Sequence, residues 1–181
     1  MWRSLVAITA AIQFAAPPSM PKSTAERYAK VIQEEAKARD FDPFTLVAMV
    51  HNESKWSPGV VNSVNCVGLG QVCLSNYAVC RASLTSAQCR AKKHQLMDGV
   101  YNLRVISNSI TLNRKFCRKK TGKPVRWRYW LPSHGGWNQP SKSIWCGQQL
   151  RRGRWVDLPV PKIVQRIMNY RKKLIRKFAR K

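Results

Sequence analysis

Apolar residues recur at helical spacing along most of the chain. Between residues 43 and 53 they fall three or four positions apart, so one face of a helix would be buried. Asp42 and Pro43 are typical of the N-cap and first position of such a helix. The same spacing predicts helices over residues 23–39 and 90–113, the second of them central to the core. The pattern therefore predicts a mainly α-helical fold.

The C-terminal residues follow a different helical pattern. From Lys162 to Lys181 there is no acidic residue, and apolar positions alternate with Arg and Lys at steps of three to four. This predicts a basic amphipathic helix over residues 161–181. Such a helix either packs on the body of the protein or lies on an anionic membrane surface. We expect its first half to pack and its cationic end to be exposed.

One carboxylate lies on an apolar helical face. The apolar positions are Leu46, Met49 and Val50, and Glu53 follows at the next position of the same stripe. Glu53 would therefore be partly desolvated, which favours the neutral acid. A carboxyl group protonated near neutral pH can donate a proton to a leaving oxygen, as in glycoside cleavage. The alternative is a Glu at a fraying helix end that points to water.

The segment after Glu53 lacks charge. No Asp, Glu, Lys or Arg occurs from Trp56 to Cys80, although about a quarter of residues are charged in a typical protein. A run of this length is not typical of ordinary solvated surface. We therefore expect it to form a specific structure beside the carboxylate.

The residues of this region resemble the lytic transglycosylase SLT family and the related goose-type lysozymes. The matching residues are Glu53-Ser54 and then Pro58-Gly-Val-Val-Asn-Ser-Val-Asn-Cys-Val-Gly68-Leu-Gly-Gln71. The resemblance implies a single, mainly α, lysozyme-like (α+β) domain with an active-site cleft. It implies that Glu53 is the catalytic acid and base, that Ser54 supports it, and that Gly68 and Gln71 line the sugar cleft.

Three positions depart from the family pattern. Gly70 stands where Met is usual, which would remove a side chain from the cleft floor and widen a subsite. Asn65 stands where Gly is usual, and Asn is among the few residues that tolerate a left-handed backbone. The segment 134–140 resembles the family's Ala-Tyr-Asn-Ala-Gly segment, so Trp137 and Asn138 would bind substrate. The indole of Trp137 cannot supply the phenol hydroxyl of the usual Tyr.

The family uses a single residue as both acid and base, so no second catalytic carboxylate is expected among the other acids of the chain. Asp98 resembles the Asp that begins a helix in the family. We therefore interpret Asp98 as a helix-start residue and not as the second member of a catalytic carboxylate pair.

The net charge calls for a polyanionic partner. The chain has 33 Lys and Arg against 8 Asp and Glu, a formal charge of +25. Nucleic acid, anionic lipid, lipopolysaccharide, teichoic acid and the peptide carboxylates of peptidoglycan all qualify. The basic run 114–128 and the aromatic residues after it would stack on sugars or bases, or form a solvated loop.

Residues 1–20 have the features of an export signal. Arg3 precedes an apolar stretch from Leu5 to Ala16 that is too short to cross a bilayer. The cleavage position is open, and an uncleaved N-terminal anchor is the alternative.

The six cysteines form an even set, which in an exported chain indicates three disulfides in an oxidising compartment. Among the possible pairings we favour Cys80 with Cys89 and Cys117 with Cys146. Cys66 and Cys73 would then clamp the loop that contains Gly68. A zinc site is not expected, because the cysteine spacings do not resemble those of a zinc finger or ribbon.

These observations predict an exported, periplasmic or secreted monomer. Residues 21–160 would form the lysozyme-like domain and residues 161–181 a helix of the same domain. The enzyme would cut peptidoglycan between N-acetylmuramic acid and N-acetylglucosamine, without cofactor, metal or nucleic acid. A transglycosylase would form 1,6-anhydro ends, and hydrolysis, as in goose-type lysozymes, is the alternative. A non-enzymatic cationic protein that binds the cell envelope is the alternative from another class, with anionic polymers or a membrane surface as partners of the basic helix.

Overall fold

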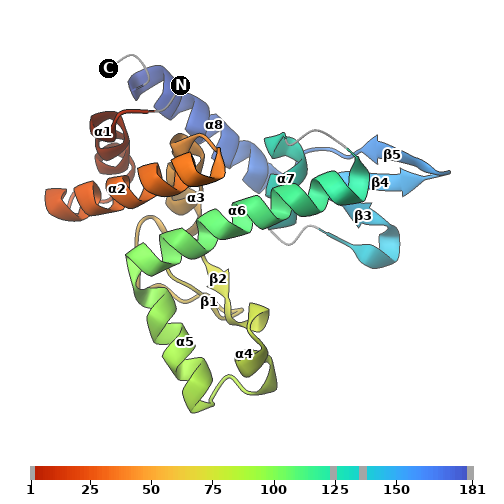
Figure 1. The fold of residues 1–181 in the computed structure, drawn as a ribbon, viewed down its shortest axis with the longest axis horizontal. Helices are drawn as coiled ribbons and strands as arrows, with labels where there is room; N and C mark the ends of the chain where they lie inside the picture. The colour runs from red at the N-terminus through yellow and green to blue at the C-terminus, as the bar shows by residue number, and fades with distance from the viewer. Residues whose placement is uncertain (1–2, 123–125, 135–137, 179–181) are drawn as a thin grey trace. The chain divides into compact units, whose positions relative to one another are not determined.

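The computed structural model describes residues 3–122, 126–134 and 138–178, and the chain is mainly helical, as predicted (Figure 1). The helices are α1 (Leu5–Ala15), α2 (Lys22–Arg39), α3 (Pro43–Ser54), α4 (Ala78–Ala82), α5 (Ala87–Met97), α6 (Gly99–Thr121), α7 (Trp127–His134) and α8 (Lys162–Phe178). Short 3-10 turns, η1 and η2, occupy Leu74–Asn76 and Pro140–Lys142.

The strands are short and antiparallel. A two-stranded ribbon pairs β1 (Cys66–Val67) with β2 (Val72–Cys73). A three-stranded sheet has the order β3-β4-β5, formed by Ile144–Trp145, Gln148–Arg151 and Arg154–Asp157.

The chain folds as two compact units. The first comprises residues 1–107 together with 169–181, and the second comprises residues 108–168. Helices α6 and α8 each contribute residues to both units.

The core of the first unit is built from α1, α2 and α3, which pack against one another (Figure 1). On α3 the predicted apolar stripe is buried: Leu46, Met49 and Val50 have no exposed surface. The helix begins as predicted, because Pro43 is its first residue and the Asp42 carboxylate accepts a hydrogen bond from the Phe44 N–H at 3.1 Å.

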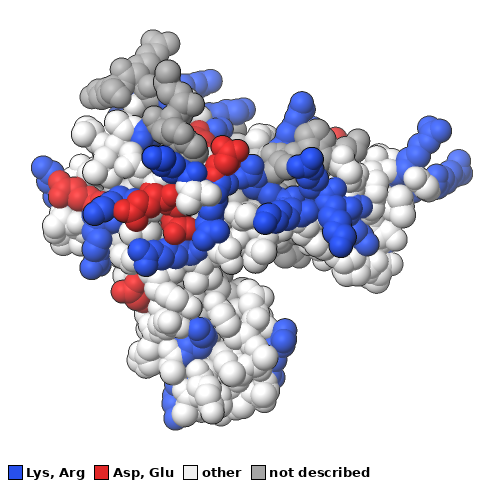
Figure 2. Space-filling view, in the orientation of Figure 1, with Lys and Arg blue, Asp and Glu red and all other residues white. Residues whose placement is uncertain are grey.

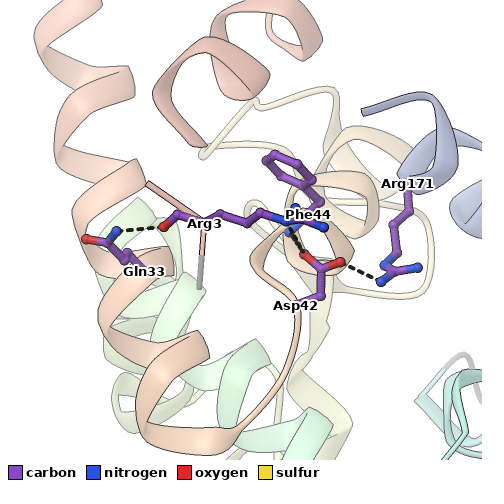
Figure 3. A network of polar contacts seen from close by, with 5 residues as sticks. All are labelled: Arg3, Gln33, Asp42, Phe44 and Arg171. Atoms are coloured by element: carbon purple, nitrogen blue, oxygen red, sulfur yellow. Dashed lines mark hydrogen bonds and ion pairs between the residues drawn. The ribbon is translucent and has the colours of Figure 1, made fainter. Parts of the chain in front are cut away.

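The Asp42 carboxylate also joins distant parts of the first unit (Figure 3). Arg171 of α8 pairs with one of its oxygens, and the Arg3 Nε lies 3.9 Å from the other. The Arg3 guanidinium lies over the Phe44 ring, 5.3 Å from its centroid, and the Arg3 carbonyl accepts a hydrogen bond from Gln33 at 2.9 Å. The beginning of α3 is therefore fixed by contacts from both ends of the chain.

Helix α1 contributes to this core. Its residues Ile8, Ala11 and Ile12 have no exposed surface, and the Ala15 carbonyl lies 2.8 Å from the Nδ1 of His51 on α3. One face of the apolar stretch interpreted as an export signal thus packs into the core of the first unit, and the other face, which includes Val6, is exposed. None of the helices in the described ranges combines the length and apolar character needed to cross a bilayer.

The single helix predicted over residues 90–113 is wrong, because α5 and α6 are separate helices. Asp98 lies between them, and its carboxylate accepts a hydrogen bond from the Tyr101 N–H at 2.6 Å. Asp98 therefore starts a helix, as interpreted from the sequence. Gly99, the first residue of α6, faces the Tyr28 ring, and a Cβ at this position would lie 2.2 Å from the Tyr28 hydroxyl.

The second unit is organised around a disulfide between α6 and the sheet. Cys117 and Cys146 form this bond, as predicted, and both are buried. The start of the basic run 114–128 is helical and not a loop, because α6 continues to Thr121. Tyr129 and Trp130 of α7 are also buried.

The predicted basic amphipathic helix is confirmed as α8. Buried apolar residues occur along the whole helix, including Leu174 at 0% and Phe178 at 7% exposure. Packing therefore extends further than the expected first half, and the exposed residues of the helix are Lys and Arg together with Gln165 and Asn169.

Candidate active site

Glu53 lies in the last turn of α3, beside the buried core of the first unit. The residue is half-buried, and burial raises the pKa of its carboxyl group. Among the described residues, no side chain or backbone group forms a hydrogen bond or ion pair with this carboxyl group. Burial therefore favours the neutral form of the Glu53 carboxyl group more than it would be favoured in an exposed Glu.

The chain turns sharply just after Glu53. Lys55 and Trp56 both have left-handed backbones, with φ of 52° and 68°. The Ser54 hydroxyl donates to the Val50 carbonyl at 3.3 Å and accepts from the Trp56 N–H at 3.2 Å. Trp56 is buried, and its ring stacks on Tyr28 with centroids 6.2 Å apart. Ser54 thus braces the end of the helix that carries Glu53.

Gly68 is required by the close packing of the loop that contains it. Its φ is +79°, and a Cβ here would lie 2.4 Å from the Leu96 carbonyl oxygen and 2.3 Å from the Asn102 amide nitrogen. The Gly68 N–H donates to the Val60 carbonyl at 2.9 Å. This bond joins the loop to the segment that leaves α3.

Gln71 closes the same loop. Its side-chain Nε2 donates to the Gly68 carbonyl at 3.0 Å and lies 3.4 Å from the Val60 carbonyl. Its backbone is left-handed, with φ of 49°. The amide nitrogen of Gln71 thus holds the loop together. The predicted contact of Gly68 and Gln71 with sugar remains a prediction.

Asn102 is a buried residue whose role the sequence did not predict. Its Oδ1 accepts from the Gly70 N–H at 2.9 Å, and its Nδ2 donates to the carbonyls of Val67 at 3.0 Å and Leu96 at 2.7 Å. The signal for this role is its position on α6. Asn102 occupies the same helical stripe as the buried Ile106 and is the one polar residue there that faces the loop.

The expectation that Gly70 opens additional space is wrong. A Cβ at Gly70 would lie 2.0 Å from the Cδ1 of Ile106, so the Ile106 side chain fills that volume. Asn65 adopts the expected left-handed backbone, with φ of 59°. Cys66 and Cys73 form the predicted disulfide and stand opposite each other in the β1–β2 ribbon, so the loop between them is clamped. The Cys80–Cys89 disulfide is also formed.

Two of the predicted substrate-binding residues, Trp137 and Asn138, fall within the range 108–168 of the second unit. Trp137 lies outside the described residues. Asn138 is described in the second unit, where its Oδ1 accepts from the Cys146 N–H at 2.9 Å. This bond fixes the Asn138 side chain beside the Cys117–Cys146 disulfide.

Comparison with protein families gave a match over the region that contains Glu53. Residues 30–111 match the transglycosylase SLT domain. The match includes Glu53, Ser54, Gly68, Gln71 and Asn102, so this part of the chain is similar to the transglycosylase SLT domain. No curated protein and no solved structure matched the chain. The match ends within α6, and β3, β4, β5 and α8 lie beyond it.

Proposed function

We propose that this protein is a peptidoglycan lytic transglycosylase that cleaves the β-1,4 bond between N-acetylmuramic acid and N-acetylglucosamine. The match of residues 30–111 to the transglycosylase SLT domain supports peptidoglycan glycan strands as the substrate class. The observation that carries the proposal is the half-buried Glu53 carboxyl, whose pKa is raised by burial at the position of the family's catalytic Glu.

In this proposal Glu53 acts twice. The protonated carboxyl donates its proton to the glycosidic oxygen, and the bond from that oxygen to C1 of N-acetylmuramic acid breaks. The resulting carboxylate then removes the proton of the 6-hydroxyl group of the same sugar. The 6-oxygen bonds to C1, a 1,6-anhydro end forms, and Glu53 regains its proton. No water is consumed.

The other acids near Glu53 in the chain favour a single-acid mechanism. Asp42 is paired with Arg171, and Asp98 caps α6. Neither carboxylate is therefore available as the second member of a pair, which two-carboxylate glycosidases require. The hydrolytic, lysozyme-type reaction uses the same acid and differs in that water attacks C1.

The cationic surface of α8 supports an anionic polymer of the cell envelope as a second partner. Asn169, Lys172, Lys173, Arg176 and Lys177 line an open groove on this helix. Lys173 and Lys177 both lie over the Phe14 ring, with nitrogen-to-centroid distances of 4.9 Å and 4.1 Å. In our proposal this crowded group of cations retains the enzyme on its polyanionic substrate layer.

The three disulfides support an oxidising compartment as the place of action. We therefore propose a periplasmic or secreted protein. Because α1 packs into the core, the mass of the exported chain should be measured. It would show whether residues 1–16 stay with the folded protein.

Release of soluble fragments from dye-labelled peptidoglycan tests the proposed activity. The wild type should release fragments, Glu53→Gln should be at least about a hundredfold slower, and the matched control Glu34→Gln, an exposed position on α2, should behave as the wild type. Equal sedimentation of all three with insoluble peptidoglycan would show that binding is intact. If the wild type binds but releases nothing, the protein is a cationic envelope-binding protein and not an enzyme.

A further inference from the structure

The β4–β5 hairpin is a compact cationic feature that lies beyond the SLT match. Its strands pair Leu150 with Trp155 and Arg151 with Arg154. Arg152 and Gly153 form the two-residue turn, both with positive φ, 46° and 75°. The four residues from Arg151 to Arg154 are exposed, and Figure 2 shows Lys and Arg side chains projecting where Figure 1 draws the tip of this hairpin.

The arginines at the hairpin tip are unfavourable for folding. Arg151 stands directly opposite Arg154, and like charges at opposed positions of an antiparallel pair destabilise it. Arg152 has the left-handed backbone of a turn in which Asn, Asp or Gly is preferred. Residues whose charge or backbone conformation is unfavourable for folding are expected at functional positions, such as those that bind a ligand.

Among the described residues of the second unit, no acid neutralises the charge of the hairpin tip. Asp157 is the one acid among residues 108–168 of the sequence. Its carboxylate is already engaged by Arg128 at 3.3 Å and by the Gln148 amide at 2.6 Å. Within the described ranges, no ion pair involves the three tip arginines. The tip is therefore ready to bind an external anion.

Apolar side chains accompany these arginines on both faces of the hairpin. Leu150 and Val156 are each 41% exposed, and Trp155 is half-buried. Because paired residues share a face and successive residues alternate, Leu150 and Trp155 lie on one face and Val156 lies on the other. A site for phosphate groups alone does not need exposed apolar residues on both faces.

Helix α8 differs from the hairpin in this respect. Most of its apolar residues, including Leu174, are buried, and Ile163, Tyr170 and Ile175 are half-buried, so it offers charge with little exposed apolar surface. The hairpin offers both, and this combination is the one that favours the boundary between lipid headgroups and acyl chains.

We propose that the β4–β5 hairpin docks this protein on an anionic phospholipid surface. The arginines bind lipid phosphates, for which guanidinium groups are well suited. Leu150, Trp155 and Val156 enter the headgroup boundary. This proposal goes beyond the proposed catalytic function, since it concerns residues outside the SLT match.

Sedimentation of the full chain with vesicles tests the proposal. The probe is vesicles of phosphatidylcholine with about a quarter phosphatidylglycerol, compared with phosphatidylcholine alone, at physiological salt. The hairpin variant carries Arg151→Gln, Arg152→Gly and Arg154→Gln. The control variant loses the same charge elsewhere, through Lys30→Gln, Lys37→Gln and Lys93→Gln. The hairpin variant should bind anionic vesicles roughly a hundredfold more weakly, at about a factor of five per cation, and the control variant only a few fold more weakly.

Two further variants separate docking from general electrostatics and from misfolding. Arg152→Gly alone should weaken vesicle binding while keeping or raising the melting temperature, because Gly suits the turn. Leu150→Ser with Val156→Thr should abolish the binding that persists at high salt. Equal losses for the hairpin and control variants would overturn the proposal. So would hairpin variants that lose binding to duplex DNA but not to vesicles. Digestion of purified peptidoglycan should be unchanged in all of them, so this test is independent of the catalytic proposal.

Discussion

The backbone N–H of Gly70 donates a hydrogen bond to the side-chain Oδ1 of Asn102, at 2.9 Å, across the boundary between the loop and α6. The same side chain donates to the carbonyls of Val67 and Leu96. One buried amide therefore holds both ends of the Gly68 turn against the helix.

Replacement of Asn102 by Leu should destabilise the protein strongly. The change leaves one N–H and two carbonyl groups without partners in a buried site, at about 1–3 kcal/mol each. We expect a loss of roughly 3 kcal/mol or more in the free energy of unfolding, measured by urea titration. Leu112→Ala, at a position on the same helix that is 57% exposed, is the control and should cost less than about 0.5 kcal/mol. Comparable losses for the two variants would contradict the role of Asn102.

Gly68→Ala tests the packing of the loop separately from its backbone conformation. Gly68 and Gly153 have nearly the same φ, 79° and 75°, but a Cβ at Gly153 would meet no atom within 4 Å. Gly153→Ala should therefore cost about 1–2 kcal/mol of backbone strain alone. Gly68→Ala should cost clearly more and should also reduce peptidoglycan cleavage. Circular dichroism melts and the dye-release assay give both values, and equal costs would argue against steric contact with Asn102.

Glu53→Gln should raise stability near neutral pH. Burial raises the pKa of the folded carboxyl above its unfolded value, so ionisation is easier in the unfolded chain and the wild type loses stability as pH rises through this range. The melting temperature of Glu53→Gln should exceed that of the wild type at pH 7. The difference should shrink on acidification and vanish below the unfolded carboxyl pKa of about 4.3. A variant that is less stable than the wild type at pH 7 would indicate a stabilising partner for Glu53.

Ile12→Ala should show whether α1 is an integral part of the first unit. Ile12 has no exposed surface, and loss of a buried Ile side chain costs about 2–5 kcal/mol. Val6→Ala, on the same helix at 76% exposure, should be nearly neutral. Chemical denaturation of the chain beginning at residue 1 provides the comparison. If both variants match the wild type, α1 does not contribute to the folded core.

Much of the site could be predicted because its signals are local in sequence. The spacing of Leu46, Met49 and Glu53 places the carboxyl on the buried stripe of one helix, and that placement depends on helical periodicity alone. The left-handed Asn65 and the disulfide pairing of Cys66 and Cys73 likewise involve residues close together in the chain.

The features that escaped prediction depend on distant contacts or on weak local signals. Asn102 bonds to Gly70 and Val67, residues more than thirty positions away. The apolar spacing continues through Asp98, so spacing alone predicted one helix over residues 90–113, although Asp98 was interpreted as a helix-start residue. Ile106 fills the space beside Gly70, and only the packing of α6 on the loop reveals this.

The mass of the muropeptides released from purified peptidoglycan tests the central claim most directly. The account predicts products lighter by one water than hydrolytic products, because the 6-hydroxyl oxygen and not water bonds to C1. These products should be absent with Glu53→Gln and present with Glu34→Gln. Full-mass reducing ends would identify a lysozyme-type hydrolase instead. Anhydro products from the Glu53→Gln variant at the wild-type rate would contradict the assignment of Glu53 as the catalytic acid.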